Sequence, residues 1–138
     1  MPQATRFIAP PSPEAQPFWE GCKRHELLVP RCLRCGAFRF FPRPMCPRCW
    51  FPQFEWVKAS GKGSLYSYVI SHSPSPASGE PPTIIAVVEL EEGMRLMALL
   101  RGVTADLGAL TIGMALEVVF EDADAEVTLL AFRPTSAR

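Results

Sequence analysis

This chain of 138 residues has little of what a self-sufficient enzyme, a membrane protein or a strong nucleic-acid binder would need. Its two histidines, His25 and His72, lie in no nucleophile motif, and no Gly-x-Ser-x-Gly run is present. No apolar run approaches the roughly 20 residues of a membrane-spanning helix. The 14 basic and 14 acidic residues cancel, and the pI of about 6.7 lies well below the value of about 9 that is typical of nucleic-acid-binding domains.

The N-terminal segment also lacks the apolar core of a signal peptide. Its first 17 residues are polar and contain five of the 15 prolines of the chain. We therefore expect a cytoplasmic protein. In that reducing compartment, paired cysteines are expected to bind a metal ion and not to form disulfides.

Four of the five cysteines form two CxxC pairs, Cys32 with Cys35 and Cys46 with Cys49, which are separated by ten residues. Each CxxC turn offers two thiolates, and a hairpin between the turns brings them face to face around a tetrahedral ion. The spacing predicts a zinc ribbon. A site closed by four thiolates has no open position for water or substrate, so the expected metal is structural. The fifth cysteine, Cys22, is expected to be a buried helix residue and not a ligand.

Two further expectations concern this ribbon. Iron can occupy a four-cysteine site and would make the protein a red electron carrier, but affinity and availability favour zinc. Glycine follows the second cysteine of the first pair, where the turn requires a positive φ, whereas Trp50 follows Cys49. The second knuckle is therefore expected to be less regular than the first.

The remaining sequence predicts one helix and a set of strands. Glu14 to Glu26 is expected to be helical, because Phe18, Trp19 and Cys22 fall on one helix face. Between the knuckles, residues 37–41 alternate well enough to form one arm of a hairpin. Five later segments are rich in β-branched and apolar residues, and most of their boundaries are turn-like stretches with glycine or acidic residues; they are residues 64–70, 83–90, 95–101, 116–121 and 127–132.

Five closely spaced strands suit a small closed barrel, because closure removes exposed edges. Their order is typical of an OB-fold whose helix between the third and fourth strands is short or absent. We predict a mainly β protein in three parts. A flexible lead covers residues 1–13, an N-terminal helix with a rubredoxin-like zinc ribbon covers 14–54, and a five-stranded OB-fold barrel covers 55–135.

The charges divide between the two halves of the chain. Residues 21–62 carry a net charge of +7 and residues 63–138 a net charge of −6. The basic half indicates either an anionic partner, such as ligand phosphates or an acidic protein face, or the ordinary solvation of a small module. Nucleic acid is the alternative that the fold classes suggest, since OB-folds and zinc ribbons often bind it. The acidic barrel half argues against that alternative.

Several motifs together resemble a known family. They are Phe18-Trp19-Glu20, the ribbon segment RCLRCGAFRFFPRPMCPRCW, the segment EWVKASGKG after it, and Gly113-Met114. The pattern, over residues 14–134, is similar to the acyl-CoA-associated OB-fold family with an N-terminal rubredoxin-like zinc ribbon, also called the domain-of-unknown-function-35 family. The tryptophan after the fourth cysteine of the ribbon is the clearest departure.

The resemblance implies a non-catalytic accessory subunit in a hetero-oligomer. Members of that family pair with thiolase-like enzymes, or with hydratases or aldolases acting on CoA thioesters, and can help to form the cleft for the CoA moiety. Cys32, Cys35, Cys46 and Cys49 carry over as metal ligands. No CoA contact carries over residue by residue.

Chemistry narrows the search for CoA or partner contacts. A CoA site needs arginine or lysine for phosphates, an aromatic ring for adenine and an apolar channel for the pantetheine arm. For each arginine taken alone, a solvated surface role stays open as the alternative. The candidate contacts are Phe18, Trp19, Arg39, Phe41, Arg43, Lys62 and His72.

Overall fold

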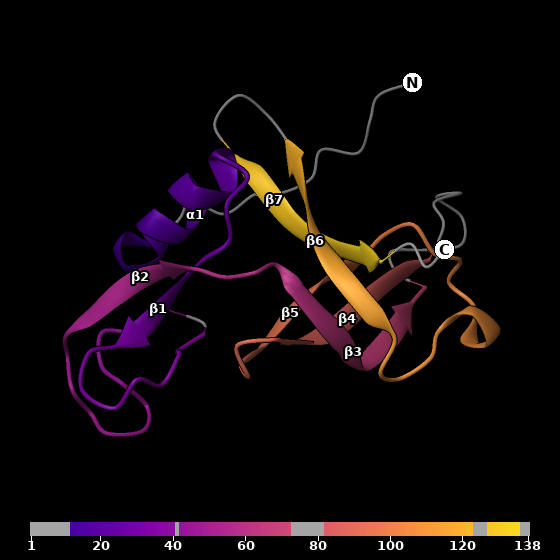
Figure 1. Ribbon diagram of the computed structural model, residues 1–138. Coiled ribbons are helices and arrows are strands. Elements are labelled where there is room, and N and C mark those ends of the chain that lie inside the picture. The colour runs from indigo at the N-terminus through magenta and orange to yellow at the C-terminus, as the bar shows by residue number, and fades with distance from the viewer. Residues whose placement is uncertain (1–11, 41, 73–81, 123–126, 136–138) are drawn as a thin grey trace.

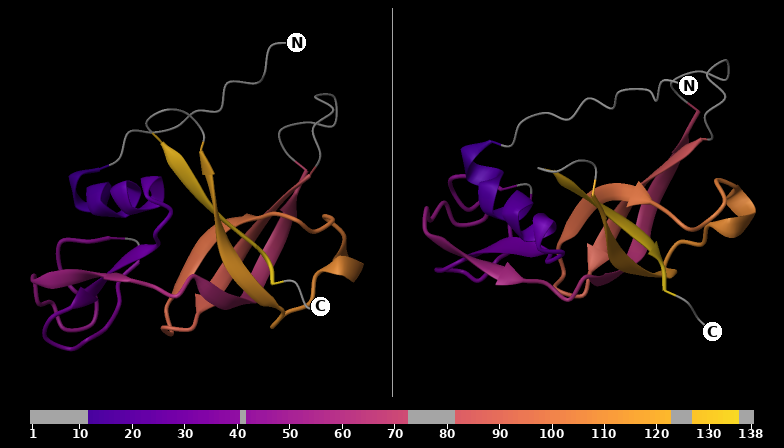
Figure 2. Two further views of the ribbon diagram at one scale, coloured as in Figure 1. Left: turned by 45° about the horizontal axis from the view of Figure 1, so that its top comes forward. Right: turned by 90° about the horizontal axis from the view of Figure 1, so that it is seen from above.

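The computed structural model describes residues 12–40, 42–72, 82–122 and 127–135, and these form two modules side by side (Figure 1). The N-terminal module holds the helix α1 (Gln16–Lys23) and a two-stranded sheet of β1 (Leu28–Cys32) and β2 (Phe54–Lys58). The C-terminal module is a closed five-stranded barrel. Viewed from above, α1 lies beside the barrel end that carries β7 (Figure 2). The expected mainly β architecture is confirmed.

The first helix is shorter than the sequence predicts. It begins as a 3-10 turn, η1 (Pro13–Ala15), and becomes α-helical only from Gln16. Ser12 stands before this turn, but its side chain makes no capping hydrogen bond. Phe18 and Cys22 are buried on one face, as the periodicity predicts. A helix of eight residues is too short to be stable alone, so the packing of this buried face stabilises α1.

The helix ends at Lys23, and His25 two residues later has a φ of 60°. The N–H of Glu26 donates to the carbonyl of Gly21, and the N–H of His25 donates to the carbonyl of Cys22, both at 2.8 Å. This pair of bonds is a Schellman motif, which satisfies carbonyls that the last helical turn leaves unpaired. The motif turns the chain from α1 into β1.

The ribbon sheet differs from the sequence expectation in one respect. β1 and β2 pair antiparallel with Val29 opposite Val57. Residues 37–40 form no strand, but Phe38 makes an antiparallel bridge to Arg31, and backbone hydrogen bonds join Cys32 to Ala37 and Arg39 to Pro30. The predicted hairpin arm is therefore present only as this short pairing with β1. Pro42 and Pro44 follow at once, and because proline has no N–H to donate, the ladder cannot continue through them.

The barrel has the strand order β3-β4-β5-β7-β6, and β3 closes it by pairing with β6 as well as β4. This is the OB-fold order, and each predicted strand lies within two residues of the observed one at both ends. A 3-10 turn, η3 (Leu107–Ala109), takes the place of the longer helix that many OB-folds have. The strands are β3 (Lys62–Ser71), β4 (Thr83–Leu90), β5 (Arg95–Leu100), β6 (Ala115–Asp122) and β7 (Thr128–Pro134).

One apolar core runs through both modules. In β4 every second residue is buried, which is the period expected when one face of a strand lines the barrel interior. Phe18 and Val29 of the N-terminal module belong to the same buried cluster as Leu65 and Phe132 of the barrel. The ribbon therefore has a fixed place on the barrel. No helix in the described part of the chain is long and apolar enough to cross a membrane.

Candidate metal centre and binding surfaces

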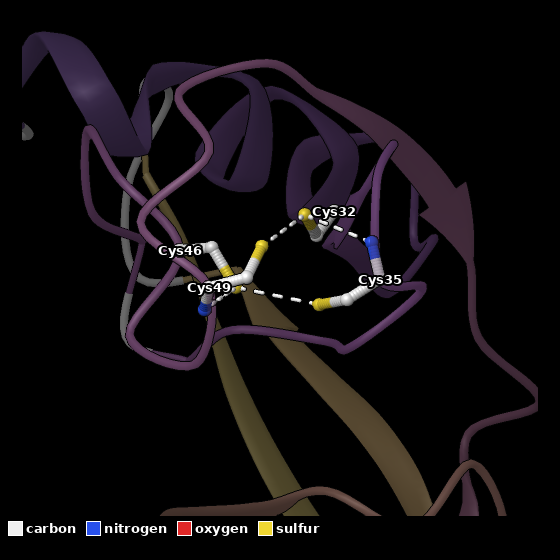
Figure 3. A group of neighbouring side chains, drawn as sticks. All are labelled: Cys32, Cys35, Cys46 and Cys49. Carbon is white, nitrogen blue, oxygen red and sulfur yellow. Dashed lines mark hydrogen bonds between the residues drawn. The ribbon is translucent and has the colours of Figure 1, made fainter.

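The four cysteines of the two CxxC pairs converge at the end of the ribbon (Figure 3). All four Sγ atoms lie within 4.8 Å of one another, and the Cys32–Cys49 and Cys35–Cys46 sulfurs are 3.6 Å apart. A tetrahedral ion with metal–sulfur bonds of about 2.3 Å needs sulfurs about 3.8 Å apart. The donor set and its spacing therefore fit a divalent metal ion.

The two knuckles repeat each other's backbone fourteen positions apart. The Sγ of Cys32 accepts N–H bonds from Arg34 and Cys35 at 3.4 and 3.5 Å. The Sγ of Cys46 accepts the matching bonds from Arg48 and Cys49, both at 3.4 Å. Such N–H donors stabilise thiolates, so each knuckle prepares a charged ligand.

Trp50 corrects the expectation of an irregular second knuckle. Its φ is 67°, close to the 76° of Gly36 at the equivalent place in the first knuckle. Its N–H donates to the carbonyl of Cys46 at 2.9 Å, and that of Gly36 donates to Cys32 at 3.0 Å. The tryptophan adopts the left-handed conformation that the turn imposes, because the hydrogen bonds of the knuckle outweigh a strain of about 1–2 kcal/mol.

The pKa values of the cysteine thiols reflect how closely the four sulfur atoms lie together. The N–H of Cys35 is the main group that lowers the pKa of Cys32 to about 6, and burial opposes it. The pKa of Cys49 is raised to about 11, since burial and three neighbouring sulfurs outweigh the N–H of Phe51. Four adjacent thiolates repel one another, and a bound cation removes that repulsion. Cys22 lies outside the cluster, and burial raises its pKa to about 12.

Arg39, predicted to contact phosphate, lies in the ribbon interior and is only 1% exposed. Its Nη1 donates to the carbonyl of Arg43 at 2.6 Å, and its Nη2 donates to that of Phe51 at 3.5 Å. The guanidinium also lies 4.4 Å from the ring centre of Phe54. Arg39 therefore joins the loop before the second knuckle to the segment after it, and a phosphate on the surface cannot reach it.

An apolar groove of about 640 Å³ opens where α1 meets the barrel. Trp19 and Phe40 form its N-terminal wall, and Phe18 packs edge-on against both rings. The outer faces of the barrel strands form the floor, which is lined by Ile85, Val87, Met97, Leu99 and Leu129. This floor was not predicted from the sequence. The sequence does contain an indication of it, because segments 83–90 and 95–101 have apolar residues at successive positions, and these positions face both sides of a strand.

The other predicted contacts do not gather in one place. Lys62 is exposed at the start of β3 and lines a separate cavity that contains none of the other candidates. Arg43 is exposed on the ribbon loop, and His72 is exposed just after β3. Phe41 lies outside the described residues. Of the predicted contacts, Phe18 and Trp19 therefore line the groove, whereas Arg43, Lys62 and His72 are scattered over the surface.

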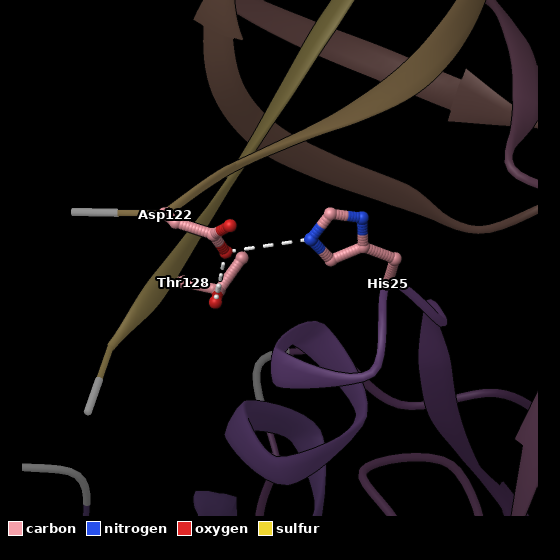
Figure 4. Close-up of polar contacts among 3 residues, drawn as sticks. All are labelled: His25, Asp122 and Thr128. Atoms are coloured by element: carbon pink, nitrogen blue, oxygen red, sulfur yellow. Dashed lines mark hydrogen bonds and ion pairs between the residues drawn. The ribbon is translucent and has the colours of Figure 1, made fainter. Parts of the chain in front are cut away.

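His25 links the helix to the barrel (Figure 4). Its ring stacks on Phe120 at 5.2 Å, and its Nε2 lies 3.3 Å from Oδ1 of Asp122. The Thr128 hydroxyl donates to the same oxygen at 2.7 Å. The hydrogen bond from Thr128 is the largest cause that lowers the pKa of the Asp122 carboxyl, and the contact with His25 is the second. The three side chains resemble a catalytic triad in composition only, because the threonine donates to the carboxylate and not to the histidine.

Two family models match adjoining parts of the chain. The ChsH2 rubredoxin-like zinc ribbon domain matches residues 19–55, and the ChsH2 C-terminal OB-fold domain matches residues 56–121. A DUF35 domain-containing scaffold protein of Methanocaldococcus jannaschii is 36% identical over 122 residues, covering 83% of this chain and 85% of the relative.

A larger relative and a solved structure are also similar. A probable enoyl-CoA hydratase alpha subunit of Thermomonospora curvata is 40% identical over 118 residues, covering 85% of this chain but only 36% of the relative. This chain thus spans about a third of the length of that subunit. A solved chain described as Ltp2-ChsH2(DUF35) aldolase superposes with a TM-score of 0.80 at 35% identity, covering 92% of this chain and 98% of that one. With its paired knuckles, its barrel order and these matches, the chain belongs to the DUF35 family.

Proposed function

We propose that this protein is a non-catalytic accessory subunit of an acyl-CoA-processing enzyme, which is a hydratase, an aldolase or a thiolase-like enzyme. The observation that carries the proposal is the apolar groove between α1 and the outer faces of β4 and β5. In OB-folds this is the face that binds ligands. Here it offers apolar side chains and one arginine, Arg95, which is already paired with Glu89 at 3.0 Å.

That lining suits the apolar part of an acyl-CoA better than nucleic acid. A single-strand site needs unpaired cations and stacking rings along the groove, whereas the floor here is aliphatic. An acyl group or pantetheine arm needs an apolar wall, which Trp19 and Met97 supply. The relative named as a probable enoyl-CoA hydratase alpha subunit supports this choice of ligand, and the similar solved chain is described as an aldolase.

Neither histidine of the chain is placed to act on a ligand in the groove. His25 is held between Phe120 and Asp122, and His72 is exposed outside the groove lining. We therefore assign catalysis to the partner and binding to this chain. Arg43, Lys62 and His72, together with Phe41, stay proposed contacts for the CoA phosphates or the partner. Phe18 and Arg39 are assigned structural roles, because both are buried.

We also propose that the metal is zinc, held by Cys32, Cys35, Cys46 and Cys49. Four thiolates close the coordination sphere, so the ion would stabilise the fold and would not touch substrate. The ribbon-domain match and the sulfur spacing support zinc in this role. Metal analysis of the purified protein tests it: one zinc per chain is expected, and a red protein with visible iron–thiolate bands would contradict it.

Affinity purification of the tagged full chain from its native host tests the accessory role. Mass spectrometry is expected to identify one acyl-CoA enzyme as a stoichiometric companion. The chain alone should show no hydratase, aldolase or thiolase activity, while the complex shows one of them. A lone monomer whose spectra do not change on adding acyl-CoA would contradict the proposal. Salt-sensitive binding of single-stranded DNA would favour the nucleic-acid alternative instead.

A further inference from the structure

The metal end of the ribbon exposes large apolar side chains that nothing in the described chain covers. Trp50 is 71% exposed, Leu33 is 54% exposed and Met45 is 45% exposed. Each of them is next to a cysteine of the metal cluster, so all three lie on the two knuckles. These three residues and Arg34 and Arg48, which lie within the CxxC turns, make up a surface that we call the knuckle face.

Trp50 is the least expected member of this face. A glycine would adopt its φ of 67° without strain, as Gly36 does in the first knuckle. The indole is mostly in solvent, so packing within the chain contributes little to offset that strain. Strained residues of this kind cluster at sites where another molecule binds, and tryptophan is enriched among the residues that dominate binding energy at protein interfaces.

The cations of this face have no carboxylate partner among the described residues, although the Arg34 guanidinium lies 5.7 Å from the ring centre of Phe51. In the barrel, Arg95, Arg101 and Arg133 each pair with a carboxylate at 2.8–3.0 Å. Within the described ranges, by contrast, no ion pair involves Arg34, Arg43 or Arg48. A zinc ion with four thiolates carries about −2. Residues 27–58 hold six Arg/Lys and one acid, so the ribbon keeps a positive charge after the metal is counted.

We infer that the knuckle face is the surface through which this chain docks on the acyl-CoA enzyme subunit, which would present an apolar pocket for Trp50 within an acidic rim. This inference rests on the proposed function. Three large apolar side chains beside unpaired arginines match a protein surface, because a phosphate backbone offers nothing for leucine or methionine to contact. A second copy of this chain fits less well, since barrel carboxylates of Glu89, Glu117 and Glu121 are already paired.

The test compares Trp50→Gly with Leu107→Ala in the full zinc-loaded chain. Leu107 is exposed to the same 71% but lies on η3 of the barrel. The probe is the enzyme subunit identified by the co-purification above, purified and titrated against each variant by calorimetry. Trp50→Gly is expected to lower the affinity about 30-fold or more, as loss of a central tryptophan does. Leu107→Ala should stay within about twofold of the wild type.

Further measurements separate docking from folding. Trp50→Gly should keep one zinc per chain and a melting temperature no lower than the wild type, because glycine suits that backbone. The double variant Arg34→Gln/Arg48→Gln should bind more weakly and with less salt dependence. With 5-fluorotryptophan incorporated, the 19F resonance of Trp50 should shift on adding the unlabelled subunit, while that of Trp56 in β2 does not.

The outcomes distinguish the two proposals. Wild-type binding that Trp50→Gly leaves unchanged would overturn the docking surface and leave the accessory role standing. A wild-type chain that binds no acyl-CoA enzyme would overturn both. Self-association, or binding of a 30-nucleotide single strand, that Trp50→Gly abolishes would show that another occupant uses this face and would also overturn the inference.

Discussion

Arg39 shows how a residue that looks like a ligand contact in the sequence can be structural. Its neighbours in the chain, Phe38 and Phe40, do not by themselves predict that the Arg39 side chain is buried. Burial depends on the carbonyls of Arg43 and Phe51, which the second knuckle brings back to it. That approach is set by tertiary contacts, so sequence patterning could not predict it. The burial of Phe18 and Cys22, by contrast, was predicted, because it follows from helical periodicity.

Arg39→Ala should therefore lower the free energy of unfolding by about 2–4 kcal/mol, because it removes a large buried side chain from the ribbon interior and takes the 2.6 Å donor from the carbonyl of Arg43. Arg43→Ala is the matched control, since its side chain is exposed and its backbone carbonyl is retained. It should change stability by less than about 0.5 kcal/mol. Urea denaturation of the zinc-loaded variants measures both. A stable Arg39→Ala that has lost only acyl-CoA binding would restore the contact role that the sequence predicted.

Among the elements, strands and knuckles were easier to predict than helix ends. The barrel strands have the alternating burial and the turn residues that define them in sequence. The knuckles follow from cysteine spacing. The helix start was wrong by two residues, because Pro13 and Pro17 favour a 3-10 turn before the first α-helical hydrogen bonds form.

Removing one ligand of the metal cluster should unfold the ribbon and spare the barrel. Cys46→Ser is expected to weaken metal binding by more than about 100-fold, and the ribbon loses the folding energy that the metal supplies. Amide exchange followed by NMR should show lost protection in β1 and β2, with protection kept in the closed ladder of β3 to β7. Cys22→Ala is the control: it removes a buried thiol outside the cluster and should keep one zinc.

The contact between His25, in the turn after α1, and Asp122 of β6 should make part of the stability depend on pH. The pKa of Asp122 is lowered in the folded chain by Thr128 and His25, so its contribution is present above the unfolded pKa of about 3.9. That contribution is lost as the pH falls through the lower, folded pKa. Asp122→Asn should therefore be slightly less stable than the wild type at pH 6, and the difference should shrink as the pH falls below about 3.9.

Urea midpoints of the two proteins between pH 2 and 6 give this difference directly. Acid also releases the metal, but both proteins lose it alike, so the difference between them at each pH reports on Asp122. A gap between the midpoints that stays constant across the range would show that the carboxylate gains nothing from Thr128 and His25.

At the scale of the whole molecule, two surfaces of different chemistry divide the proposed work. The groove, on the outer face of β4 and β5, is aliphatic and would take the apolar part of a thioester. The knuckle face, at the metal end of the ribbon, is apolar and cationic and would hold the enzyme. The sequence predicted a basic ribbon and an acidic barrel. It could not predict the groove, because α1 closes that groove from a distant part of the chain.

Met97→Lys and Trp50→Gly should separate these two roles. Met97 is 67% exposed on the groove floor, so a lysine there should fold normally. It places a charge where an apolar chain would lie, and should raise the KM of the complex for acyl-CoA about tenfold or more without dissociating the complex. Trp50→Gly should instead dissociate the complex and leave the groove unchanged. Gel filtration and steady-state kinetics of both variants measure the two effects. If Met97→Lys dissociates the complex and Trp50→Gly does not, the groove is the docking surface and the two assignments must be exchanged.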